Sequence, residues 1–380
     1  MDGVWQRWMC IGQGEASPVV THTDRGPGGV KAAPSTLSAL CAAPLGRDNG
    51  GLSAVIANDA RRTSMPLQVV ETVSPAHEDG VWSLAWKGDR IFTGGCDDKA
   101  KVWAVGRPAD HGVDAVPTAV RFLLEDHLLP VVSVGLSSDG NFGVSASMDF
   151  TIKLWDFEKL ADVGARPLLR SIDCGPGESW TVSLSSDAQR IATGSHTGKI
   201  HLYECSSGDK LLSLDSPTGK MVMAQAFSIG MGTGDRLAVG SVDGGVAIVD
   251  IEAGKAVSKW SNHSKAVRSL SWAPDGVAML SASDDGTVCI YDSRQSSTVD
   301  IMVAHESLAL CVAVSPCGTQ VASGGSDKKV RLWDLKTRTA SSSLADAHSD
   351  AVWSLAWNDA GTRLASASDD KTVNMYQCTA

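Results

Sequence analysis

The chain has 380 residues, which allows two or three ordinary domains of ~100–200 residues or one large repetitive domain. Apolar residues make up 43% and charged residues 20% of the chain, which is enough to close a core and excludes wholesale disorder. The formal charge of -10 disfavours direct binding of DNA or RNA, and the apolar runs are too short for a membrane-spanning helix.

The nine cysteines are scattered along the chain and include no C-x-x-C pair. Such spacing indicates neither a disulfide framework nor a zinc site. It is typical of a reducing compartment, where a thiol acts as a small core residue. We therefore expect no metal and no cofactor, and a location in the cytoplasm or the nucleus.

Residues 1–64 show no internal period. They contain Gly-Pro-Gly-Gly at 26–29 together with 6 basic and 5 acidic residues, and they have neither the Arg-rich composition of a transit peptide nor the apolar core of a signal peptide. We expect a disordered extension over 1–64 and one folded domain over 65–380. Because the repetitive part begins soon after Met65, that residue is an alternative start, in which case the upstream stretch would not belong to the native protein.

An aromatic or apolar residue recurs at a regular interval in the rest of the chain, usually six residues after an Asp. The 12 Trp, against 6 Phe and 3 Tyr, already suggest a fixed place for tryptophan in a repeat. The spacing advances by 52, 48, 46, 42, 42 and 43 residues, close to the period of four-stranded propeller blades. The seven positions are Trp103, Trp155, Tyr203, Val249, Tyr291, Trp333 and Tyr376.

A histidine marks the start of five of the seven copies. It precedes the Asp by 22 residues in four copies and by 20 in the first. Between the two markers the chain alternates as strand, turn and strand, for example over 267–272, 274–276 and 278–283. A tight turn at 284–287 leads into a third strand, and helical spacing is absent, so the predicted fold is all-β.

These residues resemble the WD-repeat family, and Trp155-Asp156 and Trp333-Asp334 are copies of its naming dipeptide. The resemblance covers residues 77–380 and implies a seven-bladed β-propeller. In that family His, the turn Asp, a second-strand Ser or Thr and the third-strand Trp form a hydrogen-bonded tetrad. The resemblance places full tetrads at His77, Thr93, Asp97, Trp103, at His127, Ser145, Asp149, Trp155 and at His305, Ser323, Asp327, Trp333, and partial ones at His263, Ser281, Asp285 and at His348, Ser366, Asp370.

The tetrads are expected to be structural. Each neutral link of such a buried chain contributes ~1 kcal/mol, and an orphaned member costs ~1–3 kcal/mol. Ser, His and Asp also make hydrolase triads, but here the set recurs at a constant offset, so we expect no catalysis.

Two copies depart from the pattern. The third has Gly175 and Thr197 where His and Asp would lie, and the fourth keeps Asp243 but has Val239 and Val249 and no His. We expect these blades to be held by packing alone, or partly by a docked partner. In copies five and seven a Tyr replaces the Trp, which predicts a weaker last tetrad link with aromatic packing retained.

The last copy lacks a fourth strand, because only four residues follow Tyr376. A propeller must cover its strand edges. The segment 67–73 alternates as a strand and belongs to no other copy, so we predict that it completes the seventh blade and closes the ring.

The function of a propeller lies on its faces. The repeat places one side chain of each copy where the inner strand begins and a second just before the turn Asp. Exposed aromatic and Met side chains there would mark a protein-binding surface, while the alternative is that they pack as ordinary core. The predicted partner contacts are Trp82, Val132, Met148, Trp180, Met223, Arg268, Leu310 and Trp353, with the three tryptophans as the main candidates.

The segments 76–82, 171–180 and 192–199, and a fourth copy without its His, are similar to the family of small WD-repeat subunits of the superkiller complex, which also occurs in the polymerase-associated-factor complex. The resemblance implies a non-enzymatic adaptor that is monomeric on its own. In the cytoplasm such a subunit docks on a helical-repeat scaffold that helps a helicase feed mRNA to the exosome. In the nucleus it serves transcription elongation and histone modification.

Three other functions remain to be weighed. A substrate receptor of a cullin ubiquitin ligase would use W-D-x-R boxes, of which Tyr291-Asp-Ser-Arg294 is one imperfect copy. A G-protein-β type subunit would need a coiled-coil helix before the blades, and residues 1–64 show no heptads. An enzymatic propeller would need convergent carboxylates or metal ligands beyond those of the repeat, and the sequence offers none.

Overall fold

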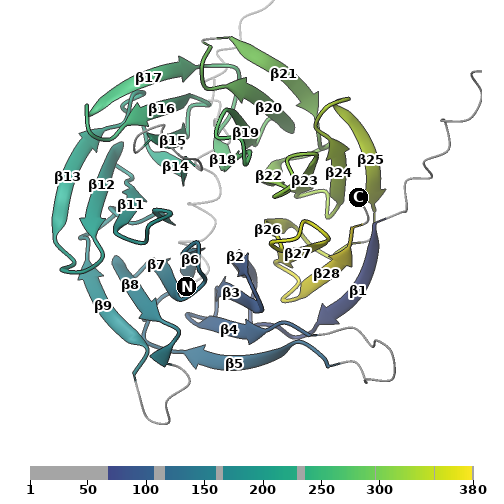
Figure 1. The fold of residues 1–380 in the computed structure, drawn as a ribbon, viewed down its shortest axis with the longest axis horizontal. Coiled ribbons are helices and arrows are strands. Elements are labelled where there is room, and N and C mark those ends of the chain that lie inside the picture. The colour runs from purple at the N-terminus through teal and green to yellow at the C-terminus, as the bar shows by residue number, and fades with distance from the viewer. Residues whose placement is uncertain are drawn as a thin grey trace, which may run out of the picture. The chain divides into compact units, whose positions relative to one another are not determined.

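The computed structural model describes residues 67–106, 116–159, 166–228, 236–295, 297–345 and 347–378. Within these ranges the chain forms 28 strands and no helix, arranged as seven four-stranded antiparallel sheets around a central axis (Figure 1). The predicted all-β, seven-bladed propeller is confirmed. The expectations about residues 1–64 and Met65 concern a part of the chain outside the described residues.

Blades one to six run from an inner to an outer strand in chain order, and blade seven takes β1 as its outer strand. Blades one to three consist of β2 Val81–Lys87, β3 Arg90–Gly95, β4 Ala100–Ala104 and β5 Ala119–Leu124; β6 Val131–Leu136, β7 Phe142–Ser147, β8 Thr151–Asp156 and β9 Leu168–Asp173; β10 Thr181–Leu184, β11 Arg190–Gly194, β12 Lys199–Glu204 and β13 Lys210–Asp215. Blades four and five consist of β14 Val222–Phe227, β15 Arg236–Ser241, β16 Val246–Asp250 and β17 Lys255–Trp260; β18 Val267–Trp272, β19 Ala278–Ser283, β20 Thr287–Asp292 and β21 Thr298–Val303. Blades six and seven consist of β22 Ala309–Val314, β23 Gln320–Gly325, β24 Val330–Asp334 and β25 Thr339–Leu344; β26 Val352–Trp357, β27 Arg363–Ser368, β28 Val373–Gln377 and β1 Gln68–Val73.

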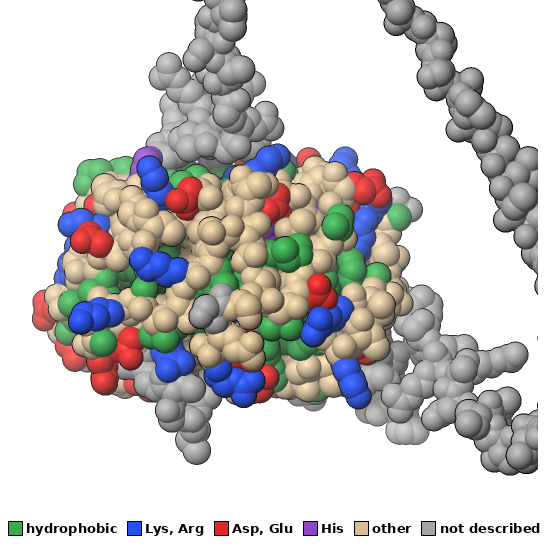
Figure 2. Space-filling view, turned by 90° about the horizontal axis from the view of Figure 1, so that it is seen from above, with side chains coloured by type: hydrophobic (Ala, Val, Ile, Leu, Met, Phe, Trp, Pro, Cys, Tyr) green, Lys and Arg blue, Asp and Glu red, His purple; other side chains and the backbone are tan. Residues whose placement is uncertain are grey.

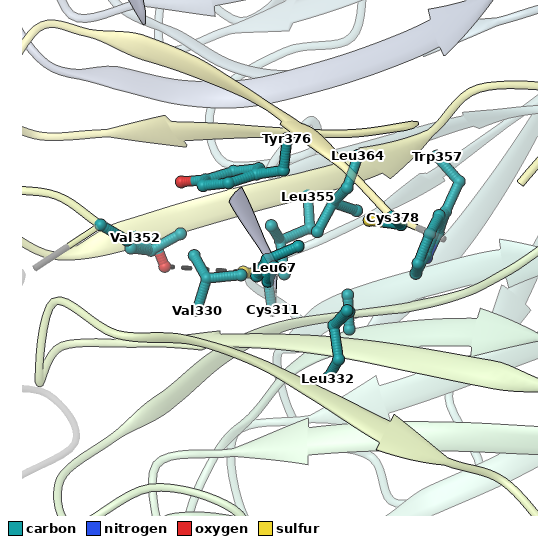
Figure 3. Packing of buried hydrophobic residues seen from close by; sticks show 12 residues of the cluster. Leu67, Cys311, Val330, Leu332, Val352, Leu355, Trp357, Leu364, Tyr376 and Cys378 are labelled. Atoms are coloured by element: carbon teal, nitrogen blue, oxygen red, sulfur yellow. Dashed lines mark hydrogen bonds between the residues drawn. The ribbon is translucent and has the colours of Figure 1, made fainter. Parts of the chain in front are cut away.

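The ring is closed by β1, which is the outer strand of blade seven. It pairs antiparallel with β28, from Gln68 opposite Gln377 to Val73 opposite Val373. The preceding Leu67 is 3% exposed and packs among side chains of blades six and seven (Figure 3). The predicted closure by the first strand is therefore confirmed.

The core lies between the blades. Each of the seven buried apolar clusters combines side chains of two neighbouring blades, as Figure 3 shows for blades six and seven. Small residues at the end of each second strand allow this approach: a Cβ on Gly94 would lie 2.6 Å from Val131 Cγ1 of the next blade. No blade can bury both of its faces alone, so the seven blades stabilise one another.

The outer strands are exposed edges that carry charge. On β17, for example, Lys255 and Lys259 are exposed. Figure 2 shows the rim on the side of blades four and five, where Lys and Arg side chains alternate with Asp and Glu and with small hydrophobic areas. Such charges prevent the edge strands from pairing with other chains.

Candidate functional site

Five blades contain a closed tetrad of buried polar side chains. In blade two, the distance from His127 Nδ1 to Asp149 Oδ2 is 3.0 Å and that from His127 Nε2 to Ser145 Oγ is 2.7 Å. Trp155 Nε1 donates to the same Ser145 oxygen at 2.9 Å. The corresponding residues of blades one and six make the same three links: His77, Thr93, Asp97, Trp103 and His305, Ser323, Asp327, Trp333.

Tyrosine replaces tryptophan in the tetrads of blades five and seven. The hydroxyl groups of Tyr291 and Ser281 lie 3.2 Å apart, and those of Tyr376 and Ser366 lie 2.7 Å apart. The last link is therefore retained in both blades. The remaining members, which bond in the same way as those of blade two, are His263, Asp285, His348 and Asp370.

The tetrads keep their carboxylates ionised and their imidazoles out of solvent. Burial opposes ionisation of Asp149, but hydrogen bonds from His127, the Leu128 amide and Thr151 hold its pKa below the ordinary value. Burial lowers the pKa of His77, against the raising effect of Asp97. A histidine side chain with no exposed surface, held on both nitrogens, serves the fold and offers no open reactive atom.

Blade three replaces the tetrad with a different polar network. His201 of β12 is 3% exposed, and its Nε2 bonds to the Glu178 carboxylate of the loop before β10. Thr193 Oγ1 donates to the Glu178 carbonyl oxygen at 3.1 Å. We expected packing alone, or partly a docked partner, to hold this blade; packing alone is wrong, because a histidine from the third strand bonds to the loop. The sequence signal was the paired Glu178 and His201, 23 residues apart.

Blade four uses apolar packing where the tetrad would lie. Val239 and Val249 are 2% and 3% exposed and belong to the cluster shared with blade three. Asp243 is exposed, and it accepts bonds from the Ser241 hydroxyl and the Gly245 amide of its own turn.

Each blade has two rim positions, one where the inner strand begins and one just before the turn residue. In blade three the His196 amide donates to the Gly177 carbonyl, three residues before Trp180. In the other six blades the backbone amide of the residue before the turn donates to the carbonyl group just ahead of the inner strand, as Met148 does to Pro130 at 3.0 Å and Asp369 to Ala351 at 3.1 Å. This repeated bond fixes a ring of paired positions around the central axis.

An aromatic pair occupies the rim at the junction of blades seven and one. The ring centroids of Trp82 and Trp353 are 6.2 Å apart at an angle of 50°, and both side chains are half-buried. Trp82 Nε1 donates to Asp369 Oδ1 at 3.0 Å. Burial raises the pKa of Asp369; the bond from Trp82 opposes this effect, and Asp350 and Asp79 add to it.

The adjoining blades two and three add further half-buried apolar side chains. Trp180 lies at the end of the loop that Glu178 and His201 hold, and its amide donates to the Gly194 carbonyl at 3.0 Å. Val132 packs partly against the core between these two blades, and Met148 is half-buried at the turn of blade two.

Two of the predicted partner contacts are buried, and a third is held in an ion pair. Leu310 and Met223 are 3% and 9% exposed, so their side chains offer almost no surface to a partner and the expectation for them is not supported. Arg268 is half-buried, and Asp284 accepts from its Nε and, at 2.7 Å to Oδ2, from its Nη2.

The structure exposes apolar side chains that the sequence interpretation missed. On top of blade two, Leu128, Leu129 and Phe150 are 80%, 46% and 41% exposed. The available signal was that the residues after the histidine are polar or charged in the other four blades that have one, at 78–79, 264–265, 306–307 and 349–350.

The described ranges contain no cluster of three or more His, Cys, Asp or Glu side chains placed to hold a metal ion. In the same ranges, no helix has the length and apolar character that a bilayer crossing requires.

Comparison with known proteins places the repeat among described families. A family model described as "WD domain, G-beta repeat" matches residues 68–104, 118–156, 254–292, 296–334 and 341–377. The unmatched stretch between 156 and 254 contains most of blades three and four, which lack the tetrad. Relatives include the WD repeat-containing protein SL1-17 of Schistosoma mansoni, which is 32% identical over 230 residues, 59% of this chain and 70% of that protein.

Two further relatives are similar over a large part of this chain. Striatin-4 of Mus musculus is 25% identical over 303 residues, 74% of this chain but 39% of its own length. The WD repeat-containing protein VIP3 of Arabidopsis thaliana is 31% identical over 229 residues, 55% of this chain and 65% of that protein. The alignments thus span about two fifths of Striatin-4 and just under two thirds of VIP3.

Proposed function

Since the chain belongs to the WD-repeat family, we propose that it is a non-enzymatic adaptor that binds other proteins through the rim of its propeller. The observation that carries this proposal is the set of three half-buried tryptophans at the rim, Trp82, Trp180 and Trp353, none of which belongs to a tetrad. Large aromatic side chains that keep part of their surface exposed are the usual anchors of protein interfaces.

The proposed complexes are the superkiller complex in the cytoplasm and the polymerase-associated-factor complex in the nucleus. Support comes from the similarity of segments 76–82, 171–180 and 192–199 to the small WD-repeat subunit of these complexes. The chain would dock on a helical-repeat scaffold next to a helicase and so support exosome-mediated mRNA decay. In the nucleus it would join the polymerase-associated-factor subunits in transcription elongation.

The geometry supports a docking role for the loop before β10, which lies in the segment 171–180. His201 and Glu178 hold the loop that ends in Trp180. A rim side chain presented by an anchored loop loses little conformational entropy on binding. The formal charge of -10 argues that RNA contact in such a complex falls to other subunits.

Purification of the tagged full chain from its own cells, followed by mass spectrometry, tests this proposal. We expect stoichiometric recovery of a helical-repeat scaffold and a helicase from the cytoplasm, and of elongation factors from the nucleus. Recovery of cullin adaptors in place of these proteins would support a ubiquitin-ligase receptor and contradict the proposal, as would a chain that is purified without partners.

A further inference from the structure

The top of blade two has an apolar surface that none of the rim positions accounts for. We define the blade-two patch as Leu128, Leu129 and Phe150. Leu128 and Leu129 follow the tetrad histidine, and Phe150 follows the tetrad Asp149 in the turn between β7 and β8.

Hydrogen bonds place the loop and the turn of this patch side by side. The Leu128 amide donates to Asp149 Oδ2 at 3.0 Å, and Ser147 Oγ donates to the Leu129 carbonyl at 2.7 Å. The patch is therefore one surface built on a rigid tetrad, although its residues are 21 positions apart in sequence.

Phe150 has a backbone conformation that large side chains avoid. Its φ is 67°, in the left-handed region that favours glycine. The residues at this place in the other six blades, all with positive φ, are Asp98, Gly198, Gly244, Gly286, Lys328 and Lys371. Phe150 is 41% exposed and belongs to none of the buried apolar clusters of the described residues. Because the positive φ recurs in all seven blades, the turn itself imposes it, and phenylalanine bears a strain there that glycine would avoid.

Acidic residues lie near the blade-two patch: Asp126 precedes its tetrad histidine, and Asp173 pairs with Thr151, the residue after Phe150. Asp126 and Asp173 are exposed, and Asp98 lies next to the patch on blade one, where burial, Asp97 and Asp149 together raise the pKa of Asp98. In the described part of the chain none of these three carboxylates forms an ion pair. Lys99, the nearby cation, is shared between Glu78 and Glu125 at 3.1 and 3.4 Å.

We propose that the blade-two patch is a second docking surface, separate from the rim tryptophans, for a short segment of another protein that carries large apolar side chains flanked by Lys or Arg. Leucine and phenylalanine side chains would be covered by the partner's apolar residues, and the unpaired carboxylates would attract its cations. A second copy of this acidic chain and an anionic lipid surface both have the wrong charge. The inference rests on the proposed adaptor role and adds the chemistry of one partner.

Residues at equivalent positions of the other blades suggest substitutions that should keep the fold. Phe150→Gly introduces the residue found at this place in blades three, four and five, and Leu128→Ser introduces the one found in blades five and seven as Ser264 and Ser349. Because glycine relieves the backbone strain, the double variant should melt at the same temperature as the wild type or a few degrees higher. Leu211→Ser, at an exposed leucine on β13, is the matched control.

The test measures binding of a fluorescein-labelled peptide, Gly-Lys-Leu-Lys-Phe-Leu-Arg-Lys-Gly, to the full chain by anisotropy. We expect the double variant to raise the Kd about tenfold or more, which corresponds to the loss of an interface hot spot, while Leu211→Ser leaves it unchanged. A matched peptide with Glu in place of Lys and Arg should not bind, and added salt should weaken binding of the basic peptide.

Absence of binding to the basic peptide, equal binding to the double variant, or equal binding of the acidic peptide would overturn the second docking surface. Purification of partners with the same double variant separates this failure from a failure of the adaptor role. If the peptide does not bind while the scaffold is still recovered, only the blade-two proposal falls. If the wild type recovers no partner, the adaptor role falls, whatever the peptide does.

Discussion

Trp82 at the start of blade one and Asp369 of blade seven are joined by a hydrogen bond of 3.0 Å from the indole Nε1 to the carboxylate Oδ1. The bond crosses the junction between blades seven and one and fixes the orientation of a tryptophan that we assign to partner binding. The same carboxylate lies among other acids, Asp350 and Asp79, so the aromatic pair is positioned by a group that is itself in an unfavourable electrostatic environment.

Replacing that carboxylate should stabilise the domain. Burial raises the pKa of Asp369 above its ordinary value, so the folded state binds a proton more readily than the unfolded one, and the wild type loses stability as the pH rises through the folded pKa. Asp369→Asn should therefore raise the Tm at pH 7 by about 1–2 °C, with the advantage shrinking toward pH 4. Calorimetry at both pH values measures this difference, and a lower Tm at pH 7 would contradict it.

Removal of the closing strand should destabilise the whole ring. Deletion of residues 65–73 removes the pairing of β1 with β28, the buried Leu67 and the Glu71 carboxylate that accepts from Thr118 at 2.6 and 2.9 Å. We expect a Tm at least about 10 °C lower and aggregation through the exposed edge of β28. Light scattering during a thermal melt measures both. A truncation of residues 1–64 alone is the control. If this truncation and the deletion of 65–73 had the same Tm, β1 would not be needed to stabilise the ring.

Mutation of the blade-two tetrad should change the stability of the domain and nothing else. Asp149 accepts from His127 at 3.0 Å, from the Leu128 amide and from Thr151, so Asp149→Ala leaves the buried His127 imidazole and two further donors without this partner. We expect a loss of about 2–4 kcal/mol in the free energy of unfolding. Urea titration measures it, with the exposed Asp126→Ala as the matched control.

The pH dependence of that loss follows from the same contacts. Hydrogen bonds hold the pKa of Asp149 below its ordinary value against the effect of burial, so its contribution is complete at neutral pH and is lost as the pH falls below about 4. Wild type and Asp149→Ala should therefore converge in stability in acid. A difference that stays constant from pH 7 to pH 3 would argue against an ionised carboxylate.

A mutation in blade three should lower partner affinity although the mutated side chain does not itself contact the partner. His201→Leu removes the bond to Glu178 and should loosen the loop that ends in Trp180, at a cost of about 1–3 kcal/mol. Amide exchange at residues 178–180 should increase and partner affinity should fall, although Trp180 is unchanged. His201→Gln, which keeps a donor, should restore part of both. Normal amide exchange in the leucine variant would show that the loop is held by other contacts.

The repeat was predictable because its markers are spaced by the fold itself. Residues such as Trp103 and His127 lie at fixed offsets in the sequence, since each blade needs the same strand lengths and the same buried tetrad. The closing strand was predictable from what the last copy lacked. These features depend on local pattern and on the rule that strand edges must be covered.

The candidate site was less predictable because exposure depends on neighbouring blades. Leu310 and Trp353 occupy equivalent positions, yet one is 3% exposed and the other half-buried. The His201–Glu178 pair and the blade-two patch arise from contacts between a strand, a loop and a turn, and no spacing common to the seven copies predicts them. Their signals were departures from the repeat, such as Phe150, a large residue at a turn position filled elsewhere by Gly, Asp or Lys.

The most direct test of the adaptor role compares partner recovery and melting temperature for two variants of the full chain. The rim variant Trp180→Ala should lose the scaffold while its Tm stays within about 2 °C of the wild type, because a half-buried loop residue contributes little to the core. The tetrad variant Asp149→Ala should keep the scaffold at low temperature and melt earlier. Full recovery of the scaffold by the Trp180→Ala variant would contradict the assignment of the rim as the docking site.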